Sequence, residues 1–255
     1  MNVLVAGGTG TLGRHVVKLL RQSGHRAAIF SRNPRGHVDA VRGDLRTGES
    51  LDRALAGMEV IVHAATGGRH SLRSRSDVGA TRRLVAAAER AGIKHIVYTS
   101  IVGIDRSSYP YHVTKRKAEA VIREGKVPWS IFRSTQFHDL IHVVLQGSSR
   151  MPGVIALPFA WQFQPVDEEE VAARVVQVAL GEPSALLDDF GGPEIRDLKS
   201  LAESWLAAHH DHRRLVNLRL PFRFSKQWTI GNLTTPEHRD GKITFDEYVA
   251  ERYAV

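Results

Sequence analysis

The amino-acid sequence predicts an α/β fold, a doubly wound parallel sheet with helices on both of its faces. Short segments rich in Val, Ile and Ala recur through the first half of the chain, each bounded by Gly, Asp, Ser or Pro. Amphipathic segments of helical period separate them. This alternation is typical of parallel strands that are buried on both faces by their crossover helices.

Six segments of the first half have the strand pattern: residues 2–6, 26–30, 38–42, 60–63, 95–99 and 129–133. Between and after them, amphipathic segments predict helices over residues 12–22, 77–91, 114–123 and 136–145. In the first of these helices, Leu12, Val16 and Leu20 fall on one face. Gly92 supplies a natural end for the second helix.

The character of the chain changes after Gly147. Residues 148–165 hold three prolines and several aromatic residues, which predicts a loop or short strands. Further helices are predicted over residues 168–180, 198–208 and 245–253. We therefore expect a single Rossmann-type domain over residues 1–255. Its core would comprise about residues 1–147 and 166–180, and a small C-terminal substrate-binding cap would comprise about residues 148–165 and 181–255.

The composition is that of an ordinary soluble globular protein, with 42% hydrophobic residues in a chain of 255. No cysteine is present, which excludes disulfides and thiolate chemistry. The first residues lack a charged segment typical of a signal peptide, and no apolar run approaches the roughly 20 residues that cross a bilayer. We expect a cytoplasmic protein with no membrane partner.

The formal net charge of +8 raises the question of nucleic-acid binding. The basic residues are scattered, apart from residues 69–75 and 212–214, and no aromatic residues interleave with the first cluster. We expect no nucleic-acid partner, and a basic surface that aids solubility or attracts phosphorylated cofactors. Neither residues 209–212 nor residues 236–247 have the ligand spacing of a metal site, so no metal is expected.

The strongest functional signal is the glycine loop that joins the first predicted strand to the first predicted helix. Gly7 permits a tight turn, Gly10 lets the backbone approach a pyrophosphate, and Gly13 lets helix and strand pack closely. The helix N-terminus favours an anion. The sequence therefore predicts a dinucleotide-binding domain, with cofactor contacts from Gly7, Thr9, Gly10, Thr11, Leu12 and Gly13.

The end of the second strand indicates which dinucleotide is bound. NAD-specific domains place an acidic residue about 20 positions after the loop, where it binds the ribose hydroxyls. Here Ser31 and Arg32 stand at that point, and no carboxylate does. Their side chains can donate hydrogen bonds and positive charge to a 2′-phosphate, and Arg35 could add to them. We therefore expect NADP(H) in preference to NAD(H).

The spacing of Gly7, Gly10 and Gly13 resembles that of the short-chain dehydrogenase/reductase superfamily, in its extended and atypical branches. Asp44-Leu45 is similar to the family's adenine-contacting pair. His63-Ala64-Ala65-Thr66 at the end of the fourth strand is similar to its N-A-A-G element. Ser100 holds the position of its catalytic serine, and Tyr111 with Lys115 matches its Y-x-x-x-K pair.

More narrowly, residues 127–138, 164–167 and 244–248 resemble atypical, NmrA-like NAD(P)H-binding proteins. The resemblance covers residues 1–180 by motif and the rest of the chain loosely.

The resemblance implies a catalytic set. Tyr111 would be the general acid/base, because a phenol with a pKa near 10 can be drawn towards neutrality by an adjacent cation. Lys115 would supply that cation and hold the nicotinamide ribose, and Ser100 would orient a substrate carbonyl. The alternative interpretations are a packed aromatic ring for Tyr111, a surface lysine for Lys115 and a turn-capping hydroxyl for Ser100.

The family's substrate pocket would draw on two further segments. Gln136, Phe137 and His138 follow the sixth strand, and Trp161 and Phe163 lie in the proline- and aromatic-rich segment. These rings favour a small apolar or aromatic substrate such as a quinone, an aromatic ketone or an enone. They could equally form the core of the cap. His138 could be a second acid/base or a structural histidine.

The leading functional hypothesis is an NADP(H)-dependent oxidoreductase that transfers hydride to or from a small carbonyl, enone or quinone. Two alternatives stay open. One is a non-catalytic NADP(H)-binding redox sensor that acts on a protein partner, and the other is an isomerase or epimerase that uses bound cofactor.

Overall fold

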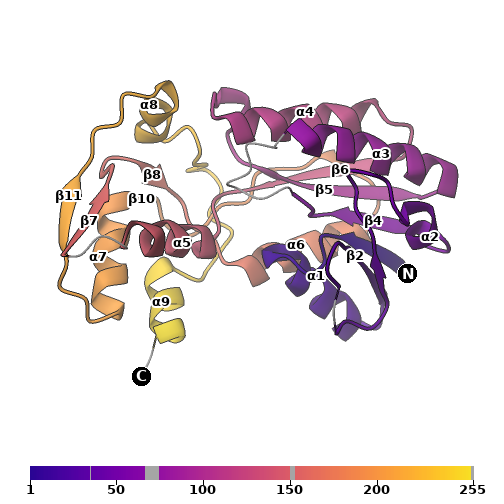
Figure 1. The fold of residues 1–255 in the computed structure, drawn as a ribbon, viewed down its shortest axis with the longest axis horizontal. Coiled ribbons are helices and arrows are strands. Elements are labelled where there is room, and N and C mark those ends of the chain that lie inside the picture. Colours follow the sequence, from indigo (N-terminus) through magenta and orange to yellow (C-terminus); the bar gives the residue numbers. More distant parts are fainter. Residues whose placement is uncertain (35, 67–74, 150–152, 254–255) are drawn as a thin grey trace. The chain divides into compact units, whose positions relative to one another are not determined.

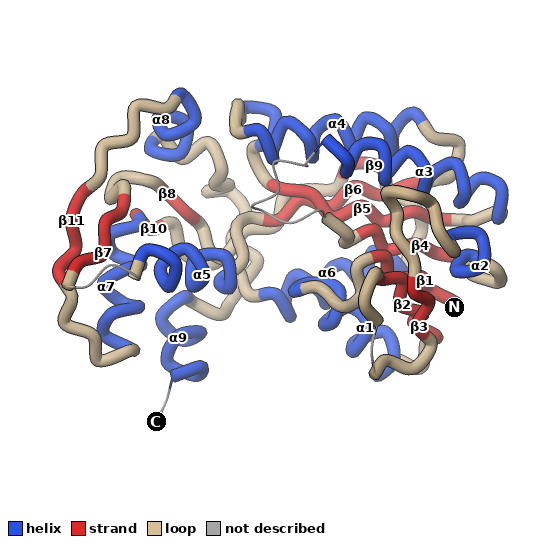
Figure 2. The backbone as a smooth tube through the Cα atoms, viewed as in Figure 1, coloured by secondary structure: helices blue, strands red, loops and turns tan. Residues whose placement is uncertain are grey.

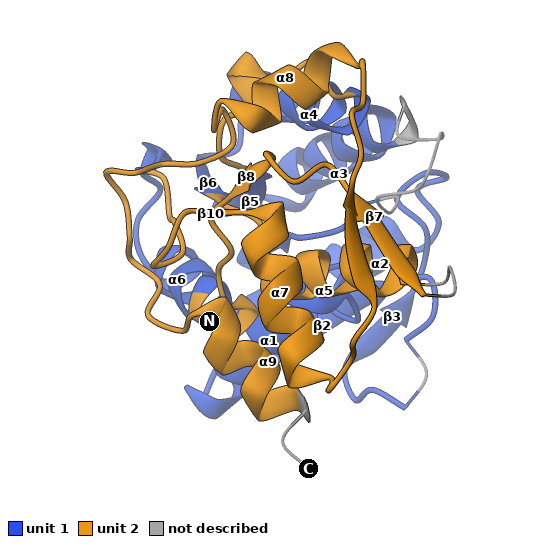
Figure 3. Ribbon diagram, turned by 90° about the vertical axis from the view of Figure 1, so that its left-hand side faces the viewer, with its two compact units in different colours: residues 1–100, 110–133, 171–188 blue, residues 101–109, 134–170, 189–255 orange. Residues whose placement is uncertain are grey.

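The computed structural model describes residues 1–34, 36–66, 75–149 and 153–253, and the chain divides into two compact units (Figure 3). Unit 1 comprises residues 1–100, 110–133 and 171–188. Unit 2 comprises residues 101–109, 134–170 and 189–255. The chain therefore leaves unit 1 and returns to it twice before it ends in unit 2.

Unit 1 is built on one seven-stranded sheet. Its strands are β1 (Asn2–Ala6), β2 (Arg26–Ser31), β3 (Ala40–Arg42), β4 (Val60–His63), β5 (His95–Ile101), β6 (Trp129–Ser134) and β9 (Ala185–Leu186). They lie in the order β3-β2-β1-β4-β5-β6-β9 and pair in parallel. This order, which reverses direction between β1 and β4, is that of a doubly wound Rossmann fold. The predicted fold class is confirmed.

Helices cover both faces of this sheet (Figures 1 and 2). Helices α1 (Thr11–Gln22) and α6 (Glu168–Leu180) lie on one face, and α3 (Arg75–Ala91) and α4 (Pro110–Glu124) lie on the other, with the short α2 (Leu51–Leu55) beside α3. The residues of the central strands are largely buried between these helices, and Val3, Leu4, Val5 and Ala6 of β1 are all 0% exposed, whereas the edge strands β3 and β9 keep exposed residues. Burial on both sides explains why these strands are continuously apolar and do not alternate.

Unit 2 carries the rest of the helices and four short strands. Its helices are α5 (His138–Ser148), α7 (Leu198–Ala208), α8 (Arg223–Thr229) and α9 (Phe245–Tyr253), with a 3-10 turn η1 (Ile104–Arg106). Strand β7 (Val154–Leu157) pairs in parallel with β11 (Arg214–Asn217), and β8 (Gln162–Phe163) pairs antiparallel with β10 (Arg196–Asp197). Its apolar core joins Leu145, Ile155, Leu198, Trp205 and Phe245.

The boundary between the units differs from the expected core and cap. Helix α5, expected in the core, belongs to unit 2, because its buried Ile141 and Leu145 pack in one cluster with residues of α7 and α9. Residues 181–188, expected in the cap, belong to unit 1, because β9 pairs with β6. The single-domain organisation stays a prediction.

The predicted elements are otherwise close to those observed, and the main extension is at α4. This helix begins at Pro110, four residues before the predicted start, since proline is well tolerated in the first turn of a helix.

Within the described part of the chain, no helix combines the length and the apolar character needed to span a membrane.

Candidate functional site

The glycine loop of unit 1 is shaped by close backbone approaches. Gly7 has a left-handed φ of 85°, and a Cβ there would come within 2.8 Å of the backbone of Ala65 at the end of β4. A Cβ on Gly13 would overlap the carbonyl oxygen of Gly7 and come within 2.8 Å of the Cα of Gly8. The loop therefore needs glycine at both positions, as the dinucleotide interpretation requires.

The N-terminus of α1 fits a pyrophosphate. Gly10 is its N-cap and makes no side-chain capping bond, and the first turn carries no acidic residue. The first amide groups of α1 therefore have no capping side chain or first-turn carboxylate of the described chain as acceptor, and the helix dipole adds positive charge at the same point. Thr9 and Gly10 are exposed and Thr11 is half-buried, whereas the side chain of Leu12 is buried in the fold.

The end of β2 is tied to this loop by a hydrogen bond of 2.8 Å between the hydroxyl groups of Thr9 and Ser31. Ser31 Oγ also accepts a bond from the amide of Asn33 at 3.3 Å. Arg32 is exposed beside them, and its guanidinium can bind a phosphate with two hydrogen bonds. Arg35 lies outside the described residues.

The predicted adenine and ribose contacts lie on the loops after β3 and β4. The Asp44 carboxylate is bound by Arg46 at 2.6 Å, and this hydrogen bond holds the pKa of Asp44 below its usual range. Leu45 points its side chain into the core of unit 1, so the backbone is what it can offer a cofactor. Ala64 and Ala65 are half-buried, and the exposed Thr66 donates a hydrogen bond to Asp77 at 3.3 Å.

The carboxyl end of β5 holds Ser100 and is contacted by the side chain of Lys115. Lys115 Nζ donates a hydrogen bond of 2.5 Å to the carbonyl oxygen of Thr99 and lies 4.1 Å from the centre of the Tyr98 ring. Its side chain is only 7% exposed, and burial lowers the pKa of Lys115 to about 8. The neighbouring Ser100 is 5% exposed, and its hydroxyl has no hydrogen-bond partner among the described residues.

Tyr111 stands in the first turn of α4, one turn before Lys115, so that the two side chains leave the same face of the helix. Its half-buried ring lies 5.9 Å from the ring of His112. The structure thus places the three predicted catalytic residues of unit 1 on two adjoining elements, the end of β5 and the start of α4.

Two buried histidines lie beside this set: His63, the first residue of the element similar to N-A-A-G, and His112, for which no role was predicted from the sequence. His63 bonds Thr81 through Nε2 at 3.0 Å and packs 5.1 Å from Tyr98, and burial, with the charge of Lys115, lowers the pKa of His63 to about 3. The same two causes lower the pKa of His112 to about 4. Both imidazoles are therefore neutral at pH 7. Their positions in the sequence were visible, but the burial that keeps them uncharged was not.

The predicted substrate contacts all lie in unit 2, and three of the five are buried. Both polar atoms of the Gln136 side chain form hydrogen bonds. Nε2 donates to the backbone carbonyl of Leu233 at 2.7 Å, and Oε1 accepts from the backbone N–H of Gln164 at 3.0 Å. His138 is 0% exposed, its Nε2 lies 3.0 Å from the carbonyl of Ile243, and burial lowers its pKa to about 4.

The aromatic members of this set differ in exposure. Phe163 is buried against the ring of Trp228, whereas Phe137 and Trp161 are partly exposed. The indole of Trp161 donates a hydrogen bond of 2.9 Å to Ser225 Oγ.

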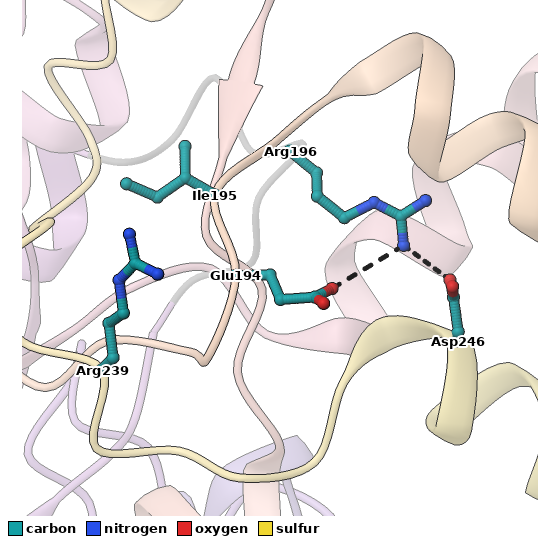
Figure 4. A pocket seen from close by; sticks show the side chains of 5 residues that line it. All are labelled: Glu194, Ile195, Arg196, Arg239 and Asp246. Atoms are coloured by element: carbon teal, nitrogen blue, oxygen red, sulfur yellow. Dashed lines mark hydrogen bonds and ion pairs between the residues drawn. The ribbon is translucent and has the colours of Figure 1, made fainter.

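A surface pocket of about 430 Å³ in unit 2 contains none of the predicted site residues (Figure 4). It is lined by Glu194, Ile195, Arg196, Arg239 and Asp246. Arg196 bonds Asp246 at 2.6 Å and lies 3.9 Å from Glu194, so most of its charged groups neutralise one another. The glycine loop and the end of β5, which hold the predicted cofactor and catalytic residues, stay the candidate functional site.

The sheet order, the glycine turn and the uncapped start of α1 define a dinucleotide-binding protein of the Rossmann type. A family model described as NAD(P)H-binding matches residues 7–145, which is more than half of the chain. The chain belongs to this NAD(P)H-binding family, as its sequence motifs predicted.

Among curated relatives, a ceramide reductase of Caulobacter vibrioides is 34% identical over 68% of this chain and 59% of its own length. The (4-alkanoyl-5-oxo-2,5-dihydrofuran-3-yl)methyl phosphate reductase of Streptomyces griseus is 30% identical over 53% of this chain and 48% of its own length. The chain thus spans about half the length of these relatives.

Solved structures share the fold at low identity. An NADPH-dependent quinone oxidoreductase of Escherichia coli has a TM-score of 0.76 at 17% identity and covers 98% of this chain and 99% of its own. A short-chain dehydrogenase/reductase superfamily protein of Agrobacterium tumefaciens, with NAD bound, has a TM-score of 0.74 at 19% identity over 100% of this chain and 96% of its own.

Proposed function

We propose that this protein is an NADPH-dependent oxidoreductase that transfers hydride between the nicotinamide and a small carbonyl, enone or quinone. The observation that carries the proposal is the state of two side chains at the end of β5: Lys115 is buried with its Nζ on the carbonyl of Thr99, and the next residue, Ser100, has a buried hydroxyl. A buried hydroxyl without a partner costs free energy, and such groups are commonly satisfied by a ligand at functional sites. Among the described residues the Ser100 hydroxyl has no such partner, and it lies one residue beyond the carbonyl that anchors Lys115.

Each of the three residues has a role in that reaction. The nicotinamide ring, when bound, supplies or accepts the hydride at the substrate carbon. Ser100 donates a hydrogen bond to the substrate oxygen, and Tyr111 gives or takes the proton at the same oxygen, so that charge balances. Lys115 stabilises the phenolate form of Tyr111 and holds the ribose.

The substrate class follows from the rings of unit 2. Phe137 and Trp161 are the proposed contacts, because they keep some exposed aromatic surface. Gln136, His138 and Phe163 support them from within the unit. Curated relatives named ceramide reductase and 3-beta-hydroxysteroid dehydrogenase (35% identical over 38% of this chain, from Mycolicibacterium neoaurum) act on largely apolar molecules, which supports an apolar substrate here.

A preference for NADPH over NADH is proposed from Ser31 and Arg32. We expect Arg32→Ala to weaken NADPH binding about 10-fold to 100-fold, the effect of losing a hydrogen bond between charged groups, and to leave NADH binding nearly unchanged. Fluorescence titration with both cofactors measures this. The exposed Arg53 of α2 offers a matched control, Arg53→Ala. Tighter binding of NADH than of NADPH by the unaltered protein would refute the preference.

Turnover of a substrate tests the activity itself. The purified protein is given NADPH with a panel of quinones, aromatic ketones and enones, and NADPH oxidation is followed by absorbance. For the best substrate, Tyr111→Phe should lower kcat about 10²-fold to 10⁴-fold with NADPH binding kept, because the proton donor is lost. The control is Tyr109→Phe, whose ring packs on Phe224 in unit 2. Full activity of Tyr111→Phe would remove Tyr111 from the mechanism.

A second function is supported by one relative. The photosystem II assembly factor Ycf39 of Trieres chinensis, 27% identical over 54% of this chain, is not named as a reductase. Tight NADPH binding with no turnover across the panel would favour the sensor hypothesis. Conversion of a substrate to an isomer with no net oxidation of NADPH would favour an isomerase or epimerase.

A further inference from the structure

A strip of unit 2 over residues 214–230, which we call the basic–apolar strip, combines exposed apolar side chains with unpaired positive charge. It runs from β11 through α8 (Figure 1). Of the eight large apolar residues that are well exposed in the described chain, four lie in these 17 residues: Val216 (38% exposed), Leu218 (40%), Phe222 (53%) and Ile230 (65%). Exposed apolar groups concentrated in one stretch mark a surface that meets a partner.

The charges of the strip have one sign. It contains four basic residues and no Asp or Glu, and the four are Arg214, Arg219, Arg223 and Lys226. All four are exposed, and none forms a salt bridge with a described residue. The nearest basic neighbour, Arg213, is instead bound to Asp211. The strip therefore presents a positive field that nothing in the described protein neutralises.

The apolar groups of the strip are held on ordered supports. Arg214 and Val216 leave one side of β11, which pairs with β7 and with no other described strand, and the amide of Leu218 continues that ladder to the carbonyl of Leu157 at 2.8 Å. The ring of Phe222 stacks on Phe224, with centroids 5.3 Å apart and planes within 8°.

The stack is extended inward, because Phe224 lies 5.9 Å from the ring of Trp228, and Trp228 meets Trp161 edge-on at 4.5 Å. An exposed phenylalanine held by an ordered stack pays little conformational entropy when it is buried by a partner.

We propose that the basic–apolar strip docks this protein on the surface of an anionic lipid bilayer. Exposed Phe, Ile, Leu and Val side chains enter the boundary between headgroups and acyl chains, and the arginines and the lysine stay at the level of the lipid phosphates. This requires no spanning helix, and it departs from the expectation, drawn from composition, that no membrane takes part.

The charge of the strip favours this occupant over a second copy of the chain. A two-fold dimer would bring the same patch against itself, so the four basic groups would face four more without an acidic partner. Repulsion of this kind weakens a contact, whereas a sheet of lipid phosphates satisfies every one of the charges. The proposal concerns unit 2 by itself and stands apart from the oxidoreductase proposal.

Vesicle sedimentation tests the proposal. The full chain is mixed with vesicles of phosphatidylcholine, either alone or with about 30% phosphatidylglycerol, at low and at physiological salt. We expect binding to the anionic vesicles, weakened by salt, and little binding to the neutral ones. Arg219→Glu with Arg223→Glu should weaken binding about 25-fold or more, at about fivefold for each cation removed. Phe222→Ser with Ile230→Ser should weaken it with all charges kept.

A matched control carries the same changes elsewhere. Val38→Ser with Arg53→Glu replaces a 77% exposed valine and an exposed arginine of unit 1 and should bind vesicles as the unaltered protein does. NADPH titration and circular dichroism check that each variant is folded. The proposal is overturned if the unaltered protein stays in the supernatant, or if the strip variants sediment as the control does. It is also overturned if the protein does not bind vesicles but forms a dimer that the substitution Phe222→Ser dissociates.

Discussion

Replacing Gly13 by alanine is expected to abolish most NADPH binding and to destabilise unit 1. A Cβ at this position would overlap the carbonyl oxygen of Gly7 and press on Cα of Gly8, and both are backbone atoms that cannot rotate away. Relieving that overlap means moving α1 away from the loop, at a cost of about 1–3 kcal/mol. Because the pyrophosphate needs the helix N-terminus and the loop in register, we expect NADPH affinity to fall at least about 100-fold.

A second glycine makes a close control for this variant. Gly147 also lies within a helix, α5, and a Cβ there meets no atom within 4 Å. Gly147→Ala should therefore leave NADPH affinity unchanged and raise stability by up to about 1 kcal/mol, the ordinary helix preference of alanine. Isothermal titration and thermal unfolding of both variants give the comparison. Unchanged NADPH affinity in Gly13→Ala would contradict the assignment of this loop to the cofactor.

Replacing Lys115 by methionine is expected to have opposite effects on turnover and on stability. Turnover should fall at least about 100-fold, because the phenolate of Tyr111 loses its neighbouring cation. The apoprotein should become more stable at pH 7, because a charge that is 7% exposed no longer has to be desolvated. From the lowered pKa of Lys115, the gain is on the order of 1–3 kcal/mol.

The pH dependence has a definite sign. The pKa of Lys115 is about 8 in the folded protein, against an ordinary value of 10.5. Between these two values the unfolded chain binds more protons, so the free energy of unfolding of the apoprotein rises with pH. Below pH 8 both states are protonated, and Lys115 adds no slope. Turnover that depends on the ammonium form should instead fall as the pH rises through about 8.

Both pH effects should be absent from Lys115→Met and present in Lys117→Met, which removes an exposed lysine of the same helix. Thermal unfolding of the apoproteins and the pH profile of kcat/KM provide the two readouts. Loss of stability in Lys115→Met, with a turnover profile like that of the unaltered protein, would assign Lys115 a structural role.

The elements of unit 1 could be predicted because their signals are local. The strands over residues 2–6 and 60–63 agree with the structure at both ends, and Gly7 directly follows the first of these apolar runs. Strand β9 and helix α2 are too short, at two and five residues, to show a period. The assignment of α5 to unit 2 depends on contacts with α7, which lies some 60 residues later in the sequence. A local sequence pattern cannot predict such contacts.

The predicted substrate residues show the same limit. Gln136 and His138 do follow the sixth strand, as predicted. The sequence does not show that the backbone carbonyls of Leu233 and Ile243, about 100 residues later, form hydrogen bonds with their side chains. Phe137, between them, keeps exposed surface. Which of these side chains stays exposed is decided by contacts with segments that are distant in the sequence.

The sequence by itself determined that a dinucleotide is held, because a glycine at each of three positions, between a strand and a helix, is a local requirement of the backbone. The tertiary structure decided the state of the groups beside it. Lys115 has a lowered pKa, His63 is neutral and the Ser100 hydroxyl is buried with no partner in the described part of the chain, because several distant segments together exclude water from them. The burial of a side chain depends on every segment that packs around it, so it cannot be predicted from a short stretch of sequence.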